Sequence, residues 1–139
     1  VVAYVAVTPR PRETYTQFYW LDENGTLNPT PCPDLVAPRA CTITIVVVNN
    51  ESRTVPYSVG IDLWEAPRIG NVTTLHNRTT LERFDFTLED ERNWTQAYTF
   101  SILKPGRYKL DLLLFRDNDF RSAYRNIFFF VTSNATAAP

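Results

Sequence analysis

Residues 41–49 read CTITIVVVN, and β-branched side chains occupy most of these positions. This composition is typical of a strand buried within a β-sheet. Asn49, Asn50, Glu51 and Ser52 then predict a turn. Beyond the turn, large apolar residues alternate with polar or small ones, as in a strand with one buried face; they are Val55, Tyr57, Val59, Ile61 and Leu63. The two stretches predict a pair of core strands.

Working outward, period-two patterning continues and no stretch holds a helical apolar stripe over three turns. We expect further strands at residues 14–22, 81–88, 94–100, 107–115 and 122–132. Residues 28–39, with four prolines, are expected to be a loop, and residues 66–79 a long loop or a ragged edge strand. Tyr108, just after Lys104, Pro105 and Gly106, stands where a tyrosine corner is expected.

Strands at this spacing predict an all-β protein, an immunoglobulin-like β-sandwich of about seven or eight antiparallel strands. Residues 14–132 form the expected sandwich domain. Residues 1–13 form an N-terminal strand and linker, and residues 133–139 a C-terminal tail too small to pack a core.

The composition of the 139 residues excludes several classes of protein. Hydrophobic residues make up 44% of the chain and aromatic residues 14%, so the chain can bury a core and is not disordered. Fourteen basic against fifteen acidic residues leave no net positive charge to attract nucleic acid. The longest apolar runs, residues 1–7 and 45–48, are far shorter than the ~20 residues of a transmembrane helix, so we expect no membrane span in this chain.

Six Asn-x-Ser/Thr sequences are the strongest indication of cellular location. Asn28 does not count, because proline follows it. We expect N-linked glycans at the six asparagines, although a threonine-rich β protein can also accumulate this tripeptide by chance. They are Asn24, Asn50, Asn71, Asn77, Asn93 and Asn134.

The only two cysteines, Cys32 and Cys41, support the same location. An even pair in a secreted chain predicts a disulfide, which would stabilise the fold by roughly 2.7 kcal/mol through closure of a loop of about ten residues. Two unpaired buried thiols are the alternative. Sequons and cysteines together predict an extracellular protein at the cell surface.

Three segments resemble one known family. The segments are residues 7–19 (VTPRPRETYTQFY), residues 47–59 (VVNNESRTVPYSV), and residues 104–110 (KPGRYKL) with 112–115 (LLLF). They resemble, in the same order, segments of an archaeal family of predicted membrane proteins, catalogued as domain of unknown function 1616. Tyr124 and Arg125 match a further pair near the end. The resemblance implies an extracellular β-sandwich and says little about activity. This chain lacks the membrane helices that usually precede the domain in that family, and the loop from Cys32 to Cys41 is not part of the family pattern.

Catalytic chemistry has little support in the sequence. No nucleophile, phosphate-binding or zinc-protease motif is present, and the single His76 lies in a polar segment. We therefore expect no enzyme, no cofactor and no metal site. Calcium stays an alternative at the acidic turns 89–91 and 117–119.

The three tryptophans leave another alternative open. Trp20, Trp64 and Trp94 could stack on sugars, although packing in the core or at an edge is favoured.

The N-terminal segment carries the functional hypothesis. Its side chains are apolar at both odd and even positions, as in a strand buried on both faces. The residues are Val1, Val2, Ala3, Tyr4, Val5, Ala6 and Val7. Such a strand can add to a neighbouring molecule. We therefore expect a glycosylated subunit of a cell-surface filament or envelope layer, a homo-polymer formed by strand exchange. The alternatives are the ectodomain of a membrane-anchored envelope protein and a carbohydrate- or ligand-binding adhesion module.

Overall fold

The computed structural model describes residues 14–134, except for residues 30, 33, 37–39 and 103. The expected donor strand, residues 1–7, lies outside the described residues. The strands are β1 (Tyr15–Leu21), β2 (Asp34–Val36), β3 (Cys41–Asn50), β4 (Val55–Glu65), β5 (Arg68–Ile69), β6 (Val72–Thr73), β7 (His76–Leu88), β8 (Asn93–Phe100), β9 (Gly106–Arg116) and β10 (Arg125–Asn134). Among these residues, no helix has the length and apolar character needed to cross a membrane.

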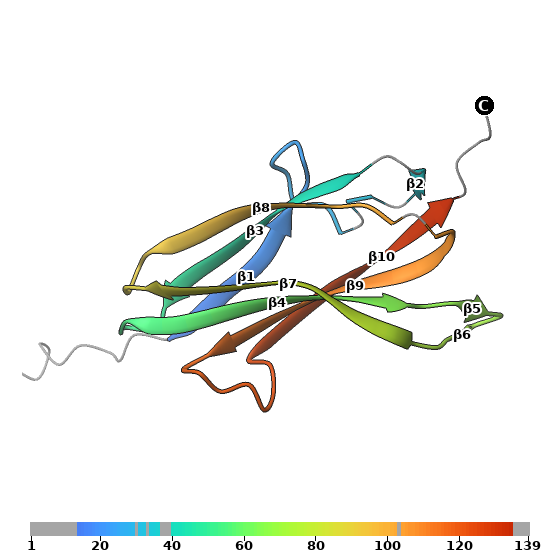
Figure 1. The fold of residues 1–139 in the computed structure, drawn as a ribbon. Coiled ribbons are helices and arrows are strands. Elements are labelled where there is room, and N and C mark those ends of the chain that lie inside the picture. The colour runs from blue at the N-terminus through green and yellow to red at the C-terminus, as the bar shows by residue number, and fades with distance from the viewer. Residues whose placement is uncertain (1–13, 30, 33, 37–39, 103, 135–139) are drawn as a thin grey trace, which may run out of the picture.

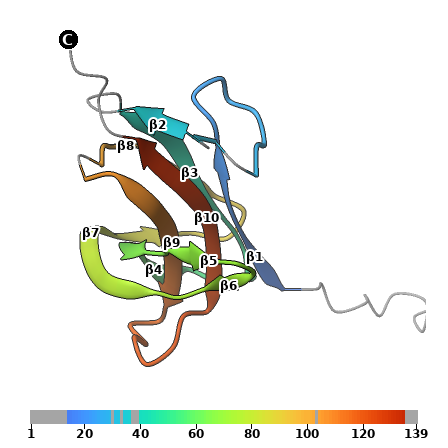
Figure 2. The same cartoon turned by 90° about the vertical axis from the view of Figure 1, so that its right-hand side faces the viewer.

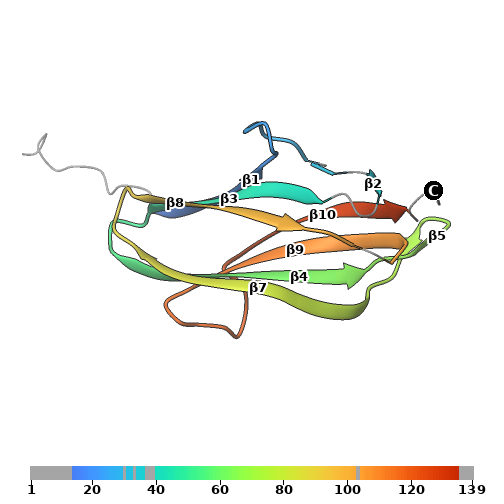
Figure 3. The same ribbon diagram turned by 45° about the horizontal axis from the view of Figure 1, so that its top comes forward.

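Two sheets pack face to face, as Figures 1 and 3 show. One has three strands in the order β1-β3-β8, and the other has five in the order β2-β10-β9-β4-β7. Strands β5 and β6 form a small separate hairpin. Between the described strands, every pairing is antiparallel except the short parallel one between β10 and β2. The predicted immunoglobulin-like β-sandwich is therefore confirmed.

The core lies between the sheets and follows the predicted alternation. Strand β3 buries Ile43, Ile45 and Val47, and the predicted face of β4 is likewise buried from Val55 to Ile61 at alternate positions. Full burial of one such side chain contributes about 1.5–3 kcal/mol. The tyrosine corner is also confirmed, because the Tyr108 hydroxyl donates a hydrogen bond of 2.8 Å to the carbonyl oxygen of Lys104.

Three segments differ from the sequence prediction. Strand β7 begins at His76 rather than at residue 81, so for residues 66–79 the alternative of a ragged edge strand is confirmed, with β5 and β6 before β7. The predicted loop 28–39 contains β2, which adds to β10. Strand β10 extends to Asn134, and Ser133 is buried with its hydroxyl donating to the carbonyl of Ile102, so the sheet reaches into the expected tail. In these edge segments, pairing with a neighbouring strand overrides a local sequence with little strand pattern.

The predicted disulfide between Cys32 and Cys41 is present, with 6.0 Å between the two Cα atoms. Cys41 opens β3 of the three-stranded sheet, whereas Cys32 precedes β2 of the five-stranded sheet. The bond therefore closes the connection in which the chain crosses from one sheet to the other.

A buried carboxylate connects the sheets at one end of the sandwich. Oε2 of Glu51 accepts hydrogen bonds from the hydroxyl of Thr16 in β1 (2.6 Å), the hydroxyl of Tyr124 just before β10 (2.8 Å) and Nη1 of Arg116 at the end of β9 (3.0 Å). Since the single Thr16 proton goes to Glu51, the Tyr57 hydroxyl of β4 donates to Thr16 over 2.8 Å. Glu51 is only 8% exposed.

The charged form of Glu51 is favoured by these contacts. Burial by itself would raise the pKa of Glu51, but the hydrogen bonds from Thr16 and Tyr124 and the positive charge of Arg116 together outweigh it. The pKa of Glu51 therefore lies below its ordinary value of 4.5. A carboxyl whose folded pKa is lowered contributes stability above its unfolded pKa, and this contribution is lost as the pH falls through the folded pKa.

The substitution Glu51→Gln tests this network. We expect it to lower the free energy of unfolding at neutral pH by about 1–3 kcal/mol, because charge-assisted hydrogen bonds at a buried site are lost. The difference from the wild type should shrink as the pH falls below about 4.5, where the unfolded carboxyl binds a proton. Urea denaturation at several pH values measures both effects.

The matched control is Asp119→Asn, which removes an exposed carboxylate paired with Arg121. This exposed pair should contribute about 0–1 kcal/mol. Equal losses for the two variants, or a Glu51→Gln loss that grows in acid, would contradict the assignment.

Removal of the disulfide by the double substitution Cys32→Ser and Cys41→Ser should lower stability by about 2–4 kcal/mol, because the unfolded chain gains conformational freedom. The measurement is thermal or urea unfolding of the variant beside the oxidised wild type. Two titratable thiols per chain in denatured, non-reduced protein would show that the bond does not form.

Candidate functional site along the open sheet edges

The two lateral sides of the sandwich are closed by different strands. Rings of β7 and β8 meet on one side, where Phe86 stacks on Trp94 at 4.0 Å between centroids. On the other side β1 faces β10, and the rings of Trp20 and Phe129 are 5.0 Å apart. Figure 2 shows β1 and β10 next to each other. Each side thus presents one edge from each sheet.

The β7–β8 side is polar. Residues 76–80 of β7 are all exposed and include His76, Asn77 and Arg78. Asn77 of β7 and Asn93 of β8 each belong to a predicted glycosylation sequence, and both are exposed. Charged edge strands resist pairing with other chains, and glycans on both edges would add to this resistance.

The β1–β10 side keeps free backbone, and its side chains around the hollow described below are mostly apolar, although the exposed Arg125 and Asn126 open β10. Within the described part of the chain, β2 pairs only with Thr132, Ser133 and Asn134 of β10, so residues 125–131 have no partner on that side. Among the described strands, β1 (YTQFYWL) is likewise an edge, with β3 on one side only. Neither free edge contains a sequon asparagine; Asn24 and Asn134 lie just beyond their ends.

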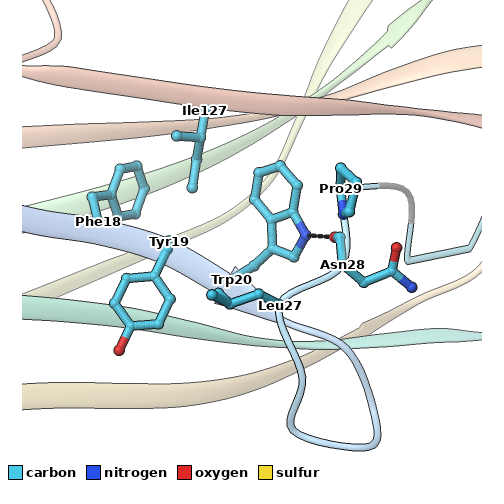
Figure 4. Close-up of a pocket in the computed structure, with 7 residues that line it drawn as sticks. All are labelled: Phe18, Tyr19, Trp20, Leu27, Asn28, Pro29 and Ile127. Carbon is cyan, nitrogen blue, oxygen red and sulfur yellow. Dashed lines mark hydrogen bonds between the residues drawn. The ribbon is translucent and has the colours of Figure 1, made fainter.

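A hollow of about 330 Å³ opens between these edges (Figure 4). Phe18 and Trp20 of β1 form one wall and Ile127 of β10 lies opposite, while the turn after β1 supplies Leu27 and Pro29. The remaining lining residues are Tyr19 and Asn28. The indole N–H of Trp20 donates 2.7 Å to the carbonyl of Asn28 and so holds the turn against the strand.

A second hollow of about 670 Å³ adjoins the first along β1, and it is lined by Gln17, Phe18, Tyr19, Leu21 and Leu27. Leu27 borders both hollows and is 74% exposed. Among the described residues that line them, none is charged. We call the first hollow, between β1 and β10, the edge groove; the second borders β1 and the turn after it and has no lining residue from β10. The position of the edge groove was not predicted, because only Leu27, an apolar residue in a polar turn, hints at it in the sequence.

The structure also places the predicted glycosylation sites. Asn24, Asn71, Asn77 and Asn93 are exposed, in or beside turns and at the starts of the edge strands β7 and β8. The side-chain amide of Asn77 donates to Glu65. Asn134 ends β10. These residues do not gather into one site.

Asn50 differs from the exposed sequons. It is half-buried at the end of β3, where it pairs with Tyr15. The next residue is the buried Glu51, whose carboxylate holds three partners. Ser52, the third residue of this sequon, has a positive φ of 64°. In the folded protein this sequon is therefore not an extended, accessible tripeptide.

The acidic turn considered for calcium is engaged by guanidinium groups. Arg53 donates to both carboxylate oxygens of Asp117, at 2.8 and 2.7 Å, and this hydrogen bonding lowers the pKa of Asp117. Arg121 binds Asp119 in the same way and lowers its pKa. Across the described residues, no group of three or more His, Cys, Asp or Glu side chains is placed to hold a metal ion.

The tryptophans have three different surroundings. Trp94 packs between the sheets and Trp20 packs against the core beside the groove, so both agree with the expected core or edge packing. Trp64 is half-buried, with the guanidinium of Arg78 5.9 Å from its ring. Among the described residues its indole nitrogen is buried without a hydrogen-bond partner.

Solved structures share this fold at low sequence identity. The CARDB domain of the PF1109 protein from Pyrococcus furiosus, solved in complex with di-metal ions, has a TM-score of 0.60 at 9% identity, over 92% of this chain and 96% of that one. A β-glucosidase from Listeria innocua in complex with glucose has a TM-score of 0.58 at 9% identity, over 91% of this chain but 17% of the enzyme. These similarities show the fold alone.

No protein with a curated description matches the sequence significantly. A family model does match: the one described as a domain of unknown function, DUF1616, covers residues 9–132. This agrees with the resemblance of the three segments, and the chain belongs to the DUF1616 family.

Proposed function

We propose that this protein is an extracellular, glycosylated structural subunit of a cell-surface filament or envelope layer, without enzymatic activity, in which subunits are linked by β-strand exchange. The observation that carries the proposal is the difference between the two lateral sides of the sandwich. The β7–β8 edges are polar and bear sequons, whereas β1 and residues 125–131 of β10 contain no sequon and border an apolar hollow. A sheet edge with these properties pairs readily with another strand.

The N-terminal segment supplies a strand of the right chemistry. Residues 1–7 (VVAYVAV) are uncharged and apolar at both parities. Burial of several hundred Å² of their surface would contribute several kcal/mol at ~25 cal/mol per Å². Donor and acceptor surfaces differ in such a contact, which is therefore heterologous and extends into an open fibre.

The ligand-binding alternative receives less support from the same site. An aromatic side chain that stacks on a sugar needs an accessible ring face. Trp20 instead packs on Phe129, and its N–H is already bound to Asn28. The envelope ectodomain differs from a filament mainly in how the subunit is anchored, and it also accommodates a glycosylated sandwich.

Deletion of residues 1–7 tests strand exchange. The buried core lies within the described residues, so the shortened chain should fold and be secreted but form no fibres. Electron microscopy and size-exclusion chromatography of native material measure assembly, and circular dichroism checks folding. Normal assembly of the shortened chain would exclude the proposal.

Glycosylation should follow exposure in the folded protein. We expect glycans at Asn24, Asn71, Asn77 and Asn93 and an unmodified Asn50, because its sequon lies against the buried Glu51. Glycopeptide mass spectrometry of native protein measures occupancy at each site, and the peptide with Asn28 is the unmodified control, since proline follows that residue. An intact mass near 16.0 kDa, or full occupancy of Asn50, would be the contrary result.

A further inference from the structure

We propose that the edge groove between β1 and β10 is the acceptor site for residues 1–7 of a second copy of this chain. The inference rests on the proposed strand exchange and adds the place where the strand binds. In that position the donated strand lies alongside the free stretch of β10, beside the place where β1 packs on β10. The free backbone of β10 supplies the hydrogen-bond partners, and the groove takes up the side chains.

The length of the free edge fits the donor. Strand β2 pairs only from Thr132 onward, so the free edge of β10 extends from Arg125 to Val131, which is seven residues. The donor segment also has seven residues, about 23 Å in extended conformation at ~3.3 Å per residue. A strand added here would pair with residues 125–131 of β10, on the side of β10 where β2 pairs further along, and would enlarge the five-stranded sheet.

The chemistry of the groove fits the same segment. The described lining residues are aromatic, aliphatic or uncharged polar, so a charged peptide would lose its hydration there without compensation. Residues 1–7 carry no charge, and both of their faces are apolar. Alternate side chains of an added strand would face the groove, and because odd and even positions of this segment are both apolar, either register would place apolar residues there.

The linker favours a second copy over the chain's own groove. Thr16 and Tyr124 both bind Glu51, so β1 and β10 begin at the same end of the sandwich. To lie along its own β10, the N-terminal segment would have to reverse direction within residues 8–13 (TPRPRE). Pro9 and Pro11 restrict the preceding residues to extended conformations, and a proline-rich linker is semi-rigid. The linker therefore favours projection of the donor away from its own domain.

The test uses two full-length variants in a complementation experiment. Val5→Lys places a charge in the donor and leaves the groove intact. Leu27→Arg places a charge beside both hollows and leaves the donor intact; since Leu27 is 74% exposed, its stability should equal that of the wild type. The matched control is Ile69→Arg, an equally drastic change at an 81% exposed residue of β5, away from the groove. Ile127→Lys, checked for folding by circular dichroism, is a second groove variant.

Native mass spectrometry and electron microscopy give the readout. We expect fibres from the wild type and Ile69→Arg, loss of fibres for Val5→Lys and Leu27→Arg alone, and dimers when these two are mixed, because the intact donor of one enters the intact groove of the other. Fibres from both groove variants, with none from Val5→Lys, would show that the groove is not the acceptor site but would leave the proposal of strand exchange in place. Fibres from Val5→Lys would overturn the proposed function itself. A wild type that stays monomeric would overturn both.

Discussion

The arrangement of strands and turns at one end of the sandwich depends on the buried, charged carboxylate of Glu51. A charge buried to this degree is tolerated only when hydrogen bonds and an opposite charge compensate for lost hydration. The compensating groups come from both sheets: Thr16 from β1, Arg116 from β9 and Tyr124 before β10. Asn49 beside it is fully buried and saturated in the same way, with its amide donating to the carbonyls of Arg53 and Leu88. Burial of these polar groups therefore requires the strands and turns at this end to meet in one arrangement.

The same anchor determines what β1 presents to the groove. Side chains two apart on a strand share a face, so fixing Thr16 toward the interior also directs Phe18 and Trp20 inward. Phe18 then lies opposite Ile127, and Trp20 reaches Phe129. A one-residue shift of β1 against β3 would move both aromatic side chains to the outer face and would leave Glu51 without Thr16. The apolar wall of the candidate site is thus a consequence of a polar contact at the end of the same strand.

The local pattern of apolar and polar residues in the sequence predicts the central strands of this fold but not its edge strands. Strands β3, β4 and β9 are buried on at least one face, so their side chains alternate by burial and could be predicted, as could Tyr108 and the disulfide. Strand β7 could not be predicted from its start, because residues 76–80 face solvent on both sides and their strand conformation comes from pairing with β4. Strand β2 has three residues among prolines and exists through its pairing with β10. The edge groove brings together residues as far apart as Phe18 and Ile127, and no spacing within the sequence encodes such a contact.

Because the described residues already form a closed core, we expect the subunit to fold without the proposed assembly. The buried cluster extends from Cys41 to Val131 and closes between two sheets that the chain itself provides. A donated strand would then add to a finished sandwich rather than replace a missing core strand. The strength of the proposed joint would depend on the groove and on the free edge of β10, and a substitution at the exposed Leu27 could weaken it without unfolding the subunit. The polar, sequon-bearing β7–β8 side would disfavour pairing at the opposite edges. Association would be confined to one side of each subunit, and a heterologous contact so confined extends as a chain rather than as a branched aggregate.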